Sequence, residues 1–139
     1  MRCWADGGWD HRRELGIASV LIEGRSKPTT VPIFNPLSSS GVCEAHALVL
    51  ALSLTPNSPD VEILMDSLTV VDMVSGKTRC TVLELLPYIR WAQRMLGERR
   101  LRWIPRDQNR AHVSIADLFA DNEHWHDYEL TMLRERKYG

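Results

Sequence analysis

Four acidic residues stand at positions where a carboxylate could take part in chemistry. They are Asp6 in Trp-Ala-Asp-Gly-Gly, Glu44 in Cys-Glu-Ala-His, Asp66 in Leu-Met-Asp-Ser, and Asp117 in Ile-Ala-Asp-Leu. Taken singly, each has a structural explanation, since Glu44 could answer a helix dipole and Asp66 could cap the helix that follows it. Taken together, the four residues suggest more than separate structural roles. Asp6 and Asp66 are expected to end neighbouring parallel strands and so to meet at one edge of a sheet.

Converging carboxylates have a chemical consequence. Four of them cannot all stay ionised at low cost unless cations are bound beside them. Hard oxygen ligands with partly open coordination suit Mg²⁺ or Mn²⁺. Two such ions can activate a water and stabilise the leaving oxygen when a phosphodiester is cleaved. The acidic set therefore favours metal-dependent phosphodiester chemistry.

Positive charge is concentrated in one stretch of the chain. Seven arginines lie between Arg90 and Arg110, opposed only by Glu98 and Asp107, whereas residues 111–133 hold five acids and neither Lys nor Arg. Arginine suits forked contacts with phosphate. On charge alone, a solvated helix face with ordinary ion pairs is the favoured interpretation, and a phosphate-binding surface is the alternative.

Hydrophobic pattern and turn residues indicate the elements that must position these groups. We expect strands at residues 2–6, 16–22, 29–34, 61–65 and 101–104, and helices at 42–54, 68–74, 81–96, 113–122 and 128–137. Pro87 should break or kink the third helix. The order predicts one α/β domain over residues 1–139. Its mixed five-stranded sheet has three antiparallel strands followed by two parallel ones, and helices flank it.

Composition agrees with a single soluble domain. The chain has 139 residues, of which 44% are hydrophobic and 25% charged, and its formal net charge is −1. Its three cysteines lie far apart, which argues against a disulfide framework or a zinc knuckle. No signal peptide is expected, and the longest apolar stretch, residues 45–54, is too short to span a bilayer. We therefore expect a cytoplasmic protein that does not contact a membrane.

The ordered set of motifs resembles a type 1 ribonuclease H of the ribonuclease H-like superfamily. The residues that carry the resemblance are Asp6-Gly7-Gly8, Glu44-Ala45-x-Ala47-Leu48, Asp66-Ser67 and Ala116-Asp117-Leu118-x-Ala120, the last preceded by Trp103-Ile104-Pro105-Arg106. The similarity covers about residues 1–121. No single motif is specific, but their order and the gaps of 38 and 22 residues between the first three acids are typical of that family.

The resemblance implies a ribonuclease H-like fold and endonucleolytic hydrolysis of RNA in RNA–DNA hybrids, leaving 5′-phosphates, with two Mg²⁺ or Mn²⁺ ions. By that resemblance Asp6 and Asp66 would share the metals, and Glu44 would hold one metal and contact the ribose hydroxyl. Asp117 would complete the second metal site. His112 is a candidate for the mobile catalytic histidine of relatives, or else a residue without a catalytic role.

Contacts with nucleic acid are predicted for six polar residues: Ser39, Ser40, Ser67, Arg106, Asn109 and Arg110. The basic protrusion that many relatives carry is missing, so the arginines would have to grip the substrate. Trp91 and Trp103 are expected to be buried. A cluster formed by His124 and His126 with Asp121 and Asp127 is better explained as an exposed polar turn than as a metal site.

Two alternatives stay open at this point. The same carboxylates would serve a nuclease of this superfamily that cleaves double-stranded RNA or structured DNA. The chain could also be a hybrid-binding module without catalysis. In either case the expected partner is nucleic acid, with no small-molecule cofactor, and the expected state is a monomer.

Overall fold

The computed structural model of the chain describes residues 1–34 and 38–112. Its elements, in chain order, are β1 (Arg2–Asp10), β2 (Leu15–Ile22), β3 (Thr29–Ile33), α1 (Ser40–Leu54), β4 (Glu62–Met65), α2 (Leu68–Val74), α3 (Leu86–Leu96), β5 (Arg100–Trp103) and the 3₁₀ turn η1 (Arg106–Gln108). The predicted helices at 113–122 and 128–137, with Asp117 and the His124–His126 region, lie outside the described residues.

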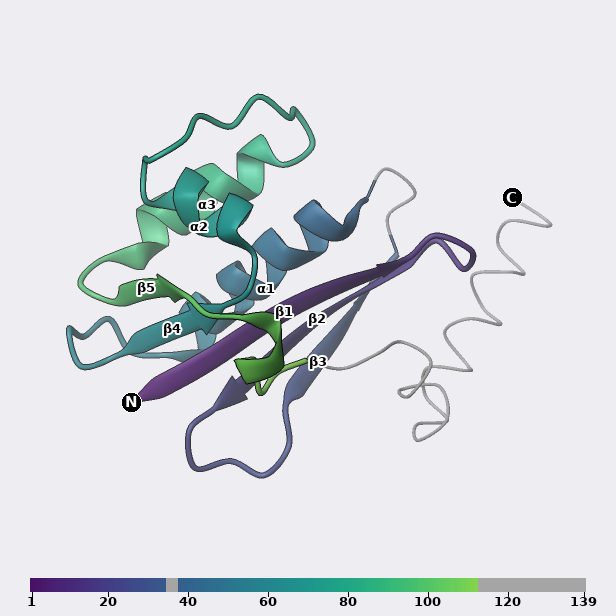
Figure 1. Cartoon of the computed structure of the whole chain (residues 1–139). Helices are drawn as coiled ribbons and strands as arrows, with labels where there is room; N and C mark the ends of the chain where they lie inside the picture. The colour runs from purple at the N-terminus through teal and green to yellow at the C-terminus, as the bar shows by residue number, and fades with distance from the viewer. Residues whose placement is uncertain (35–37, 113–139) are drawn as a thin grey trace.

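The five strands form one mixed sheet in the order β3-β2-β1-β4-β5. Antiparallel pairs join β1 to β2 and β2 to β3, whereas β4 runs parallel to both β1 and β5. The predicted fold class is confirmed, including the change from antiparallel to parallel pairing. Figure 1 shows the three helices gathered on one side of this sheet.

Strand β1 is longer than the strand predicted at residues 2–6, since Gly7 and Gly8 do not end it. They instead continue the ladder, pairing with Ala18 and Ile17 of β2. The chain reverses later, at residues 11–14, where Glu14 takes a positive φ of 49°. Asp6 therefore lies within a strand, paired with Ser19, rather than at its end.

Helix α3 is shorter than predicted and Pro87 does not kink it. The helix begins at Leu86, so the proline falls in the first turn, where its missing N–H is not needed. Residues 75–85, which join α2 to α3, contain no helix. Within the described parts of the chain, no helix is long and apolar enough to cross a membrane.

The main core fills the space between the helices and one face of the sheet. Cys3 and Ala5 of β1, with Ile63 of β4, are fully buried there against apolar residues of α1 such as Leu48. Alternate residues of the strands point the other way, as the twofold periodicity of a strand requires. On that second face Trp4, Leu64, Ile104 and Ala111 form a smaller buried cluster.

Two tryptophans differ from expectation. Trp91 on α3 is 51% exposed and Trp103 at the end of β5 is 42% exposed, although both were predicted to be buried. In the case of Trp103, the indole N–H donates to the Asp66 carbonyl at 3.1 Å. Its position is set by this polar contact rather than by burial in the core.

Candidate active site

Asp6 and Asp66 lie side by side on neighbouring parallel strands. The register of β1 and β4 runs from Arg2↔Glu62 to Ala5↔Met65, so the next residues along the chain in each case are Asp6 and Asp66. Asp6 is buried, with 8% of its surface exposed. The expectation that these two carboxylates converge is confirmed, and the cause is strand register rather than two coincident strand ends.

Glu44 reaches the same place from the first turns of α1, on a helix that crosses β1 at very short range. A Cβ atom added to Gly7 would overlap the backbone of Cys43 and the amide nitrogen of Glu44. Only glycine allows this approach, which is the usual meaning of a glycine within a strand. Because Gly7 directly follows Asp6, this close contact brings Glu44 near Asp6.

Replacing Gly7 with alanine is expected to destabilise the protein by about 2–3 kcal/mol, because backbone atoms on both sides must separate to admit a methyl group. The displaced helix would also carry Glu44 away from Asp6 and lower any activity of the site. Gly8→Ala is the matched control, since its added Cβ would meet only the Ile17 side chain, at 3.3 Å, and no backbone atom. Urea unfolding of both variants decides the matter, and equal stability would contradict this account of Gly7.

The three described carboxylates sense one another electrostatically. Burial, followed by the charge of Asp66, raises the pKa of Asp6 to about 6, while a hydrogen bond with His112 opposes the rise. Burial also raises the pKa of Glu44, helped by the charges of Asp66 and Asp6 and opposed by a hydrogen bond with Ser67 and by nearby Arg106. Desolvation and like charge both disfavour the ionised forms. This is the environment in which a bound cation would be stabilising.

A short segment after β5 lies against this group. His112 Nδ1 is 3.0 Å from Asp6 Oδ2. The Asn109 side-chain nitrogen is 3.4 Å from Asp66 Oδ1. Arg106 lies in η1, exposed, and its charge acts on Glu44. Each of the three carboxylates therefore interacts with one residue of the segment 105–112: Asp6 with His112, Asp66 with Asn109, and Glu44 with Arg106.

The donor set fits a divalent cation in its chemistry. Carboxylate oxygens are the ligands that Mg²⁺ and Mn²⁺ prefer, and the mutual repulsion of these three groups is what such an ion would relieve. Among residues 1–34 and 38–112, no group of three or more His, Cys, Asp and Glu side chains makes a metal site by itself. Asp117, the fourth predicted ligand, lies outside the described residues.

Two of the three serines predicted to contact nucleic acid cap helices. The Ser39 hydroxyl accepts a hydrogen bond from Val42 N at 3.4 Å and caps α1, next to exposed Ser40. The Ser67 hydroxyl accepts from Val70 N at 3.3 Å and caps α2, and it also holds Glu44. A nucleic-acid contact at these serines stays a prediction, since capping leaves exposed Ser39 and Ser40 accessible.

Asn109 is the most deeply buried of the six residues predicted to contact nucleic acid. It is only 6% exposed, and its side-chain amide is bonded within the protein, to Ala5 and Ala111, so its contact with nucleic acid stays a prediction. Position in a polar loop suggested an exposed residue. No signal in the sequence indicates that this one side chain of the loop turns inward.

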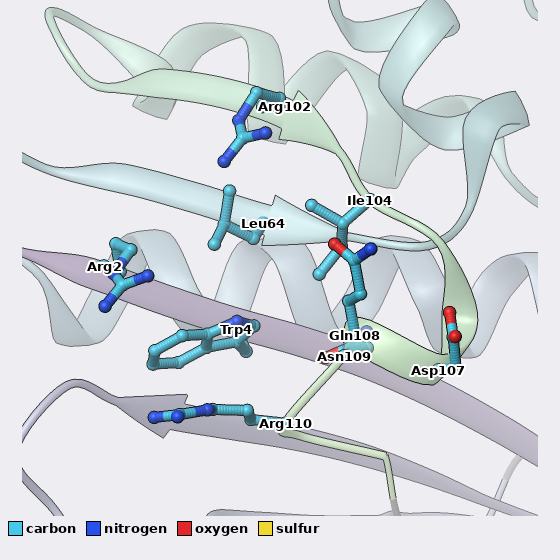
Figure 2. Close-up of a pocket in the computed structure, with 9 residues that line it drawn as sticks. All are labelled: Arg2, Trp4, Leu64, Arg102, Ile104, Asp107, Gln108, Asn109 and Arg110. Carbon is cyan, nitrogen blue, oxygen red and sulfur yellow. The ribbon is translucent and has the colours of Figure 1, made fainter.

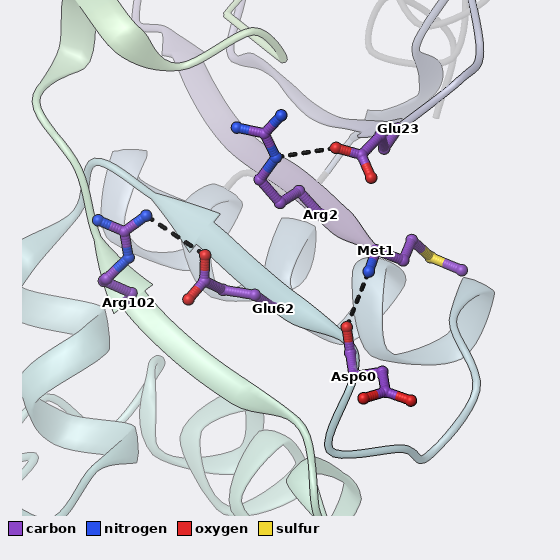
Figure 3. A network of polar contacts seen from close by, with 6 residues as sticks. All are labelled: Met1, Arg2, Glu23, Asp60, Glu62 and Arg102. Atoms are coloured by element: carbon purple, nitrogen blue, oxygen red, sulfur yellow. Dashed lines mark hydrogen bonds and ion pairs between the residues drawn. The ribbon is translucent and has the colours of Figure 1, made fainter.

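The arginines do not form one surface. The Arg99 guanidinium donates to main-chain carbonyls within the protein. Arg100 and Arg102 both approach Glu62, with Arg102 at 3.3 Å. Figure 3 shows the Arg102 pair and the pair of Arg2 with Glu23. For these residues the interpretation as ordinary ion pairs holds, whereas Arg90, Arg94, Arg106 and Arg110 are exposed.

A pocket of about 410 Å³ opens on the second face of the sheet, beside the carboxylates. Its floor is the apolar cluster around Trp4, and Arg2, Arg102 and Arg110 stand around it (Figure 2). The Arg110 guanidinium lies 5.0 Å from the centre of a Trp4 ring, a distance typical of a cation–π contact. Asn109 belongs both to this pocket and to the carboxylate group.

Known structures share this fold. The N-terminal RNase H domain of a Mycobacterium tuberculosis protein, solved as a fusion with maltose-binding protein, is 24% identical, with a TM-score of 0.60 over 78% of this chain and 84% of that one. RNase H1 from the halophilic archaeon Halobacterium salinarum is 18% identical, with a TM-score of 0.65 over 79% and 89%. LC11-RNase H1, solved in complex with an RNA/DNA hybrid, is 18% identical, with a TM-score of 0.62 over 78% and 88%.

No curated protein sequence matches the chain closely enough to count as a relative. A match to a protein family is clear, however. The family is described as Reverse transcriptase-like, and the match runs over residues 5–121, from the residue before Asp6 to beyond Asp117. With a sheet and helices that superpose on RNase H structures, the chain belongs to the Reverse transcriptase-like family of ribonuclease H-like proteins.

Proposed function

We propose that this protein is a metal-dependent endonuclease that hydrolyses the RNA strand of RNA–DNA hybrids with two Mg²⁺ or Mn²⁺ ions. The observation that carries the proposal is the meeting of Asp6, Glu44 and Asp66 from three separate elements, in surroundings that raise the pKa of Asp6 and of Glu44. Ionising these buried carboxylates costs stability, and carboxylates perturbed in this way cluster at functional sites. The hybrid bound to LC11-RNase H1 supports the choice of substrate.

In this proposal Asp6 and Asp66 share the metals, Glu44 holds one of them, and Asp117 completes the second site. When bound, the metals would supply an activated water and offset charge on the scissile phosphate. The chain's own residues fix the ligands. His112 orients the Asp6 carboxylate through Nδ1, and the Ser67 hydroxyl orients Glu44. Two side chains of this kind reduce the freedom of the carboxylates before a metal arrives.

Substrate binding in this proposal rests on fewer arginines than the sequence suggested. Arg106, whose charge acts on Glu44, and Arg110, which lies over Trp4 in the neighbouring pocket, are both exposed and are the best placed to contact the phosphate backbone. Phosphate contacts give affinity that falls with salt and does not depend on base sequence. Recognition of RNA would come from Glu44 at the ribose hydroxyl.

The proposal predicts cleavage of a uniformly labelled RNA–DNA hybrid in Mg²⁺ or Mn²⁺ and no cleavage in chelator. A chimeric strand with a few ribonucleotides should be cut only within or beside them, because the ribose hydroxyl is required. Asp66→Asn should lower the rate by about a thousandfold or more, since a ligand that orients the reacting groups is lost. Asp107→Asn, an exposed acid of η1, is the matched control and should retain the rate of the wild type.

Double-stranded RNA and DNA of the same sequence are measured beside the hybrid. Preferential cleavage of either would replace the proposed substrate with another one for the same site. Tight hybrid binding without cleavage in both metals would show a binding module. Near-normal cleavage by Asp66→Asn would overturn the assignment of the site.

A further inference from the structure

Asn109 lies where three parts of the site meet. Its side-chain nitrogen donates to the Ala5 carbonyl at 2.9 Å and lies 3.4 Å from Asp66 Oδ1. Its side-chain oxygen accepts from the Ala111 N–H at 3.1 Å. Ala5 directly precedes Asp6, and Ala111 directly precedes His112. One buried amide thus holds Asp66 itself and the neighbours of both members of the Asp6–His112 pair.

The backbone of Asn109 makes a second set of connections. Its N–H donates to the Arg106 carbonyl at 3.1 Å, and its carbonyl accepts from the His112 N–H at 3.2 Å. These two bonds fix the spacing of Arg106 and His112 on either side of it. The segment 105–112, which interacts with all three carboxylates, is therefore folded around Asn109.

The chemistry of the amide explains why asparagine stands here. The position requires donors toward a carbonyl and a carboxylate, and an acceptor toward an N–H, for a side chain that is largely buried. Of the side chains of this length, only asparagine offers both, because an ionised aspartate accepts only and leucine does neither. An unpaired group left at this burial would carry the full cost of desolvation.

We propose that Asn109 is a positioning residue that holds Asp66, Asp6 and His112 in one arrangement, so that metal ligands are in place before metal and substrate bind. The inference rests on the proposed function and concerns the same site. Asn109 does not touch the substrate in this account. It acts through the carboxylates, and its loss should change metal binding and turnover more than hybrid affinity.

The test compares Asn109→Ala and Asn109→Asp with the wild type in steady-state cleavage of a hybrid and in calorimetric titration with Mn²⁺. Both variants should show kcat lowered by about 100-fold, the size of effect that follows a misplacement of about 1 Å. KM for the hybrid should stay within about threefold, since the phosphate contacts are untouched. The Mn²⁺ dissociation constant should rise by about tenfold or more, as for other residues that orient metal ligands.

Two controls separate positioning from stability. Gln108→Ala changes the exposed neighbour in the same turn and should leave all three quantities unchanged. Arg99→Met destabilises the protein elsewhere and, at a temperature where it is folded, should bind Mn²⁺ like the wild type. A folded Asn109 variant with wild-type kcat and Mn²⁺ affinity would overturn the proposal. So would a loss of Mn²⁺ affinity in Arg99→Met equal to that of the Asn109 variants.

A readout without activity or metal keeps the inference separate from the proposed function. In the metal-free protein, the side-chain amide protons of Asn109 should exchange slowly with solvent and shift in the NMR spectrum when Asp66 is changed to alanine. Rapid exchange with no shift would overturn the inference even if hybrids are cleaved. Slow exchange, a shift and weakened Mn²⁺ binding in the variants would support it even if hybrids are not the substrate.

Discussion

Replacing Asp6 with asparagine is expected to abolish hybrid cleavage and, at the same time, to make the metal-free protein more stable at neutral pH. Asp6 is buried beside Asp66, and its pKa is raised to about 6 from 3.8. Its ionised form is therefore disfavoured in the folded protein. Asparagine removes the charge and keeps a group of the same size that can still bond to His112.

The sign of the pH dependence follows from the raised pKa. Between about pH 4 and pH 6 the folded protein binds more protons at Asp6 than the unfolded chain does, so the stability contributed by this group falls as pH rises. Above about pH 6 the cost is complete. With 1.36 kcal/mol for each pKa unit, it is on the order of 3 kcal/mol at most. We expect Asp6→Asn to recover about 1–2 kcal/mol of this at pH 8 in chelator.

Urea unfolding in chelator at pH 8 and pH 4.5 measures this effect. The gain of Asp6→Asn over the wild type should be large at pH 8 and small at pH 4.5, where wild-type Asp6 is already protonated in the folded state. Asp60→Asn makes the same charge change at an exposed position and controls for net charge. A variant that is less stable than the wild type at pH 8 would show that the ionised carboxylate is favoured by its surroundings.

Much of the fold could be predicted from local pattern. Apolar stretches such as the β-branched residues 16–22, a long run of helix formers at residues 42–54 and the turn residues between elements predicted every described strand and α-helix. Boundaries were wrong where one residue type has two meanings. Gly7 and Gly8 signal a turn or a close backbone approach, and Pro87 signals a kink or a helix start. Tertiary contacts decide between these meanings, and local sequence does not contain them.

The site could be predicted only where its residues follow a local pattern in the sequence. Asp6, Glu44 and Asp66 can be recognised because their order and spacing in the sequence are typical of the family. The role of Asn109 depends on a turn that directs one amide inward, which composition does not indicate. The arginine stretch misled in the opposite way. Arg99 donates to carbonyls at helix ends, whereas Arg100 and Arg102 on β5 both approach Glu62, so the arginines of this stretch do not form one surface.

Arg99 shows this separation most clearly, and its replacement by methionine is expected to have the largest effect on stability. The guanidinium donates to carbonyls at the C-terminal ends of two helices. From α1 these are Leu52 and Thr55, at 3.0 and 2.9 Å, and from α3 they include Leu96, at 3.3 Å. Its Nε also donates to Pro56, at 3.0 Å. The last carbonyls of a helix have no partner within the helix, so a fixed cation there satisfies them and answers both dipoles.

Arg99→Met keeps the aliphatic stem and leaves those carbonyls without their donor. We expect a loss of about 3 kcal/mol, because hydrogen bonds to a charged group are worth more than neutral ones and several are lost together. Arg99→Lys should lose most of the same amount, since a single ammonium cannot reach the ends of both helices as a planar fork does. Arg90→Met, an exposed position on α3, is the control and should change stability by less than about 0.5 kcal/mol.

Urea unfolding measures these differences in the free energy of unfolding, and the dependence of that free energy on urea concentration is compared between the variants. The same variants distinguish the structural role from the phosphate contact that the sequence suggested. If Arg99 gripped the substrate backbone, Arg99→Met would keep its stability and bind the hybrid with a smaller salt dependence. We expect the reverse: a lower unfolding midpoint, with an unchanged dependence of hybrid affinity on salt at temperatures where the variant is folded.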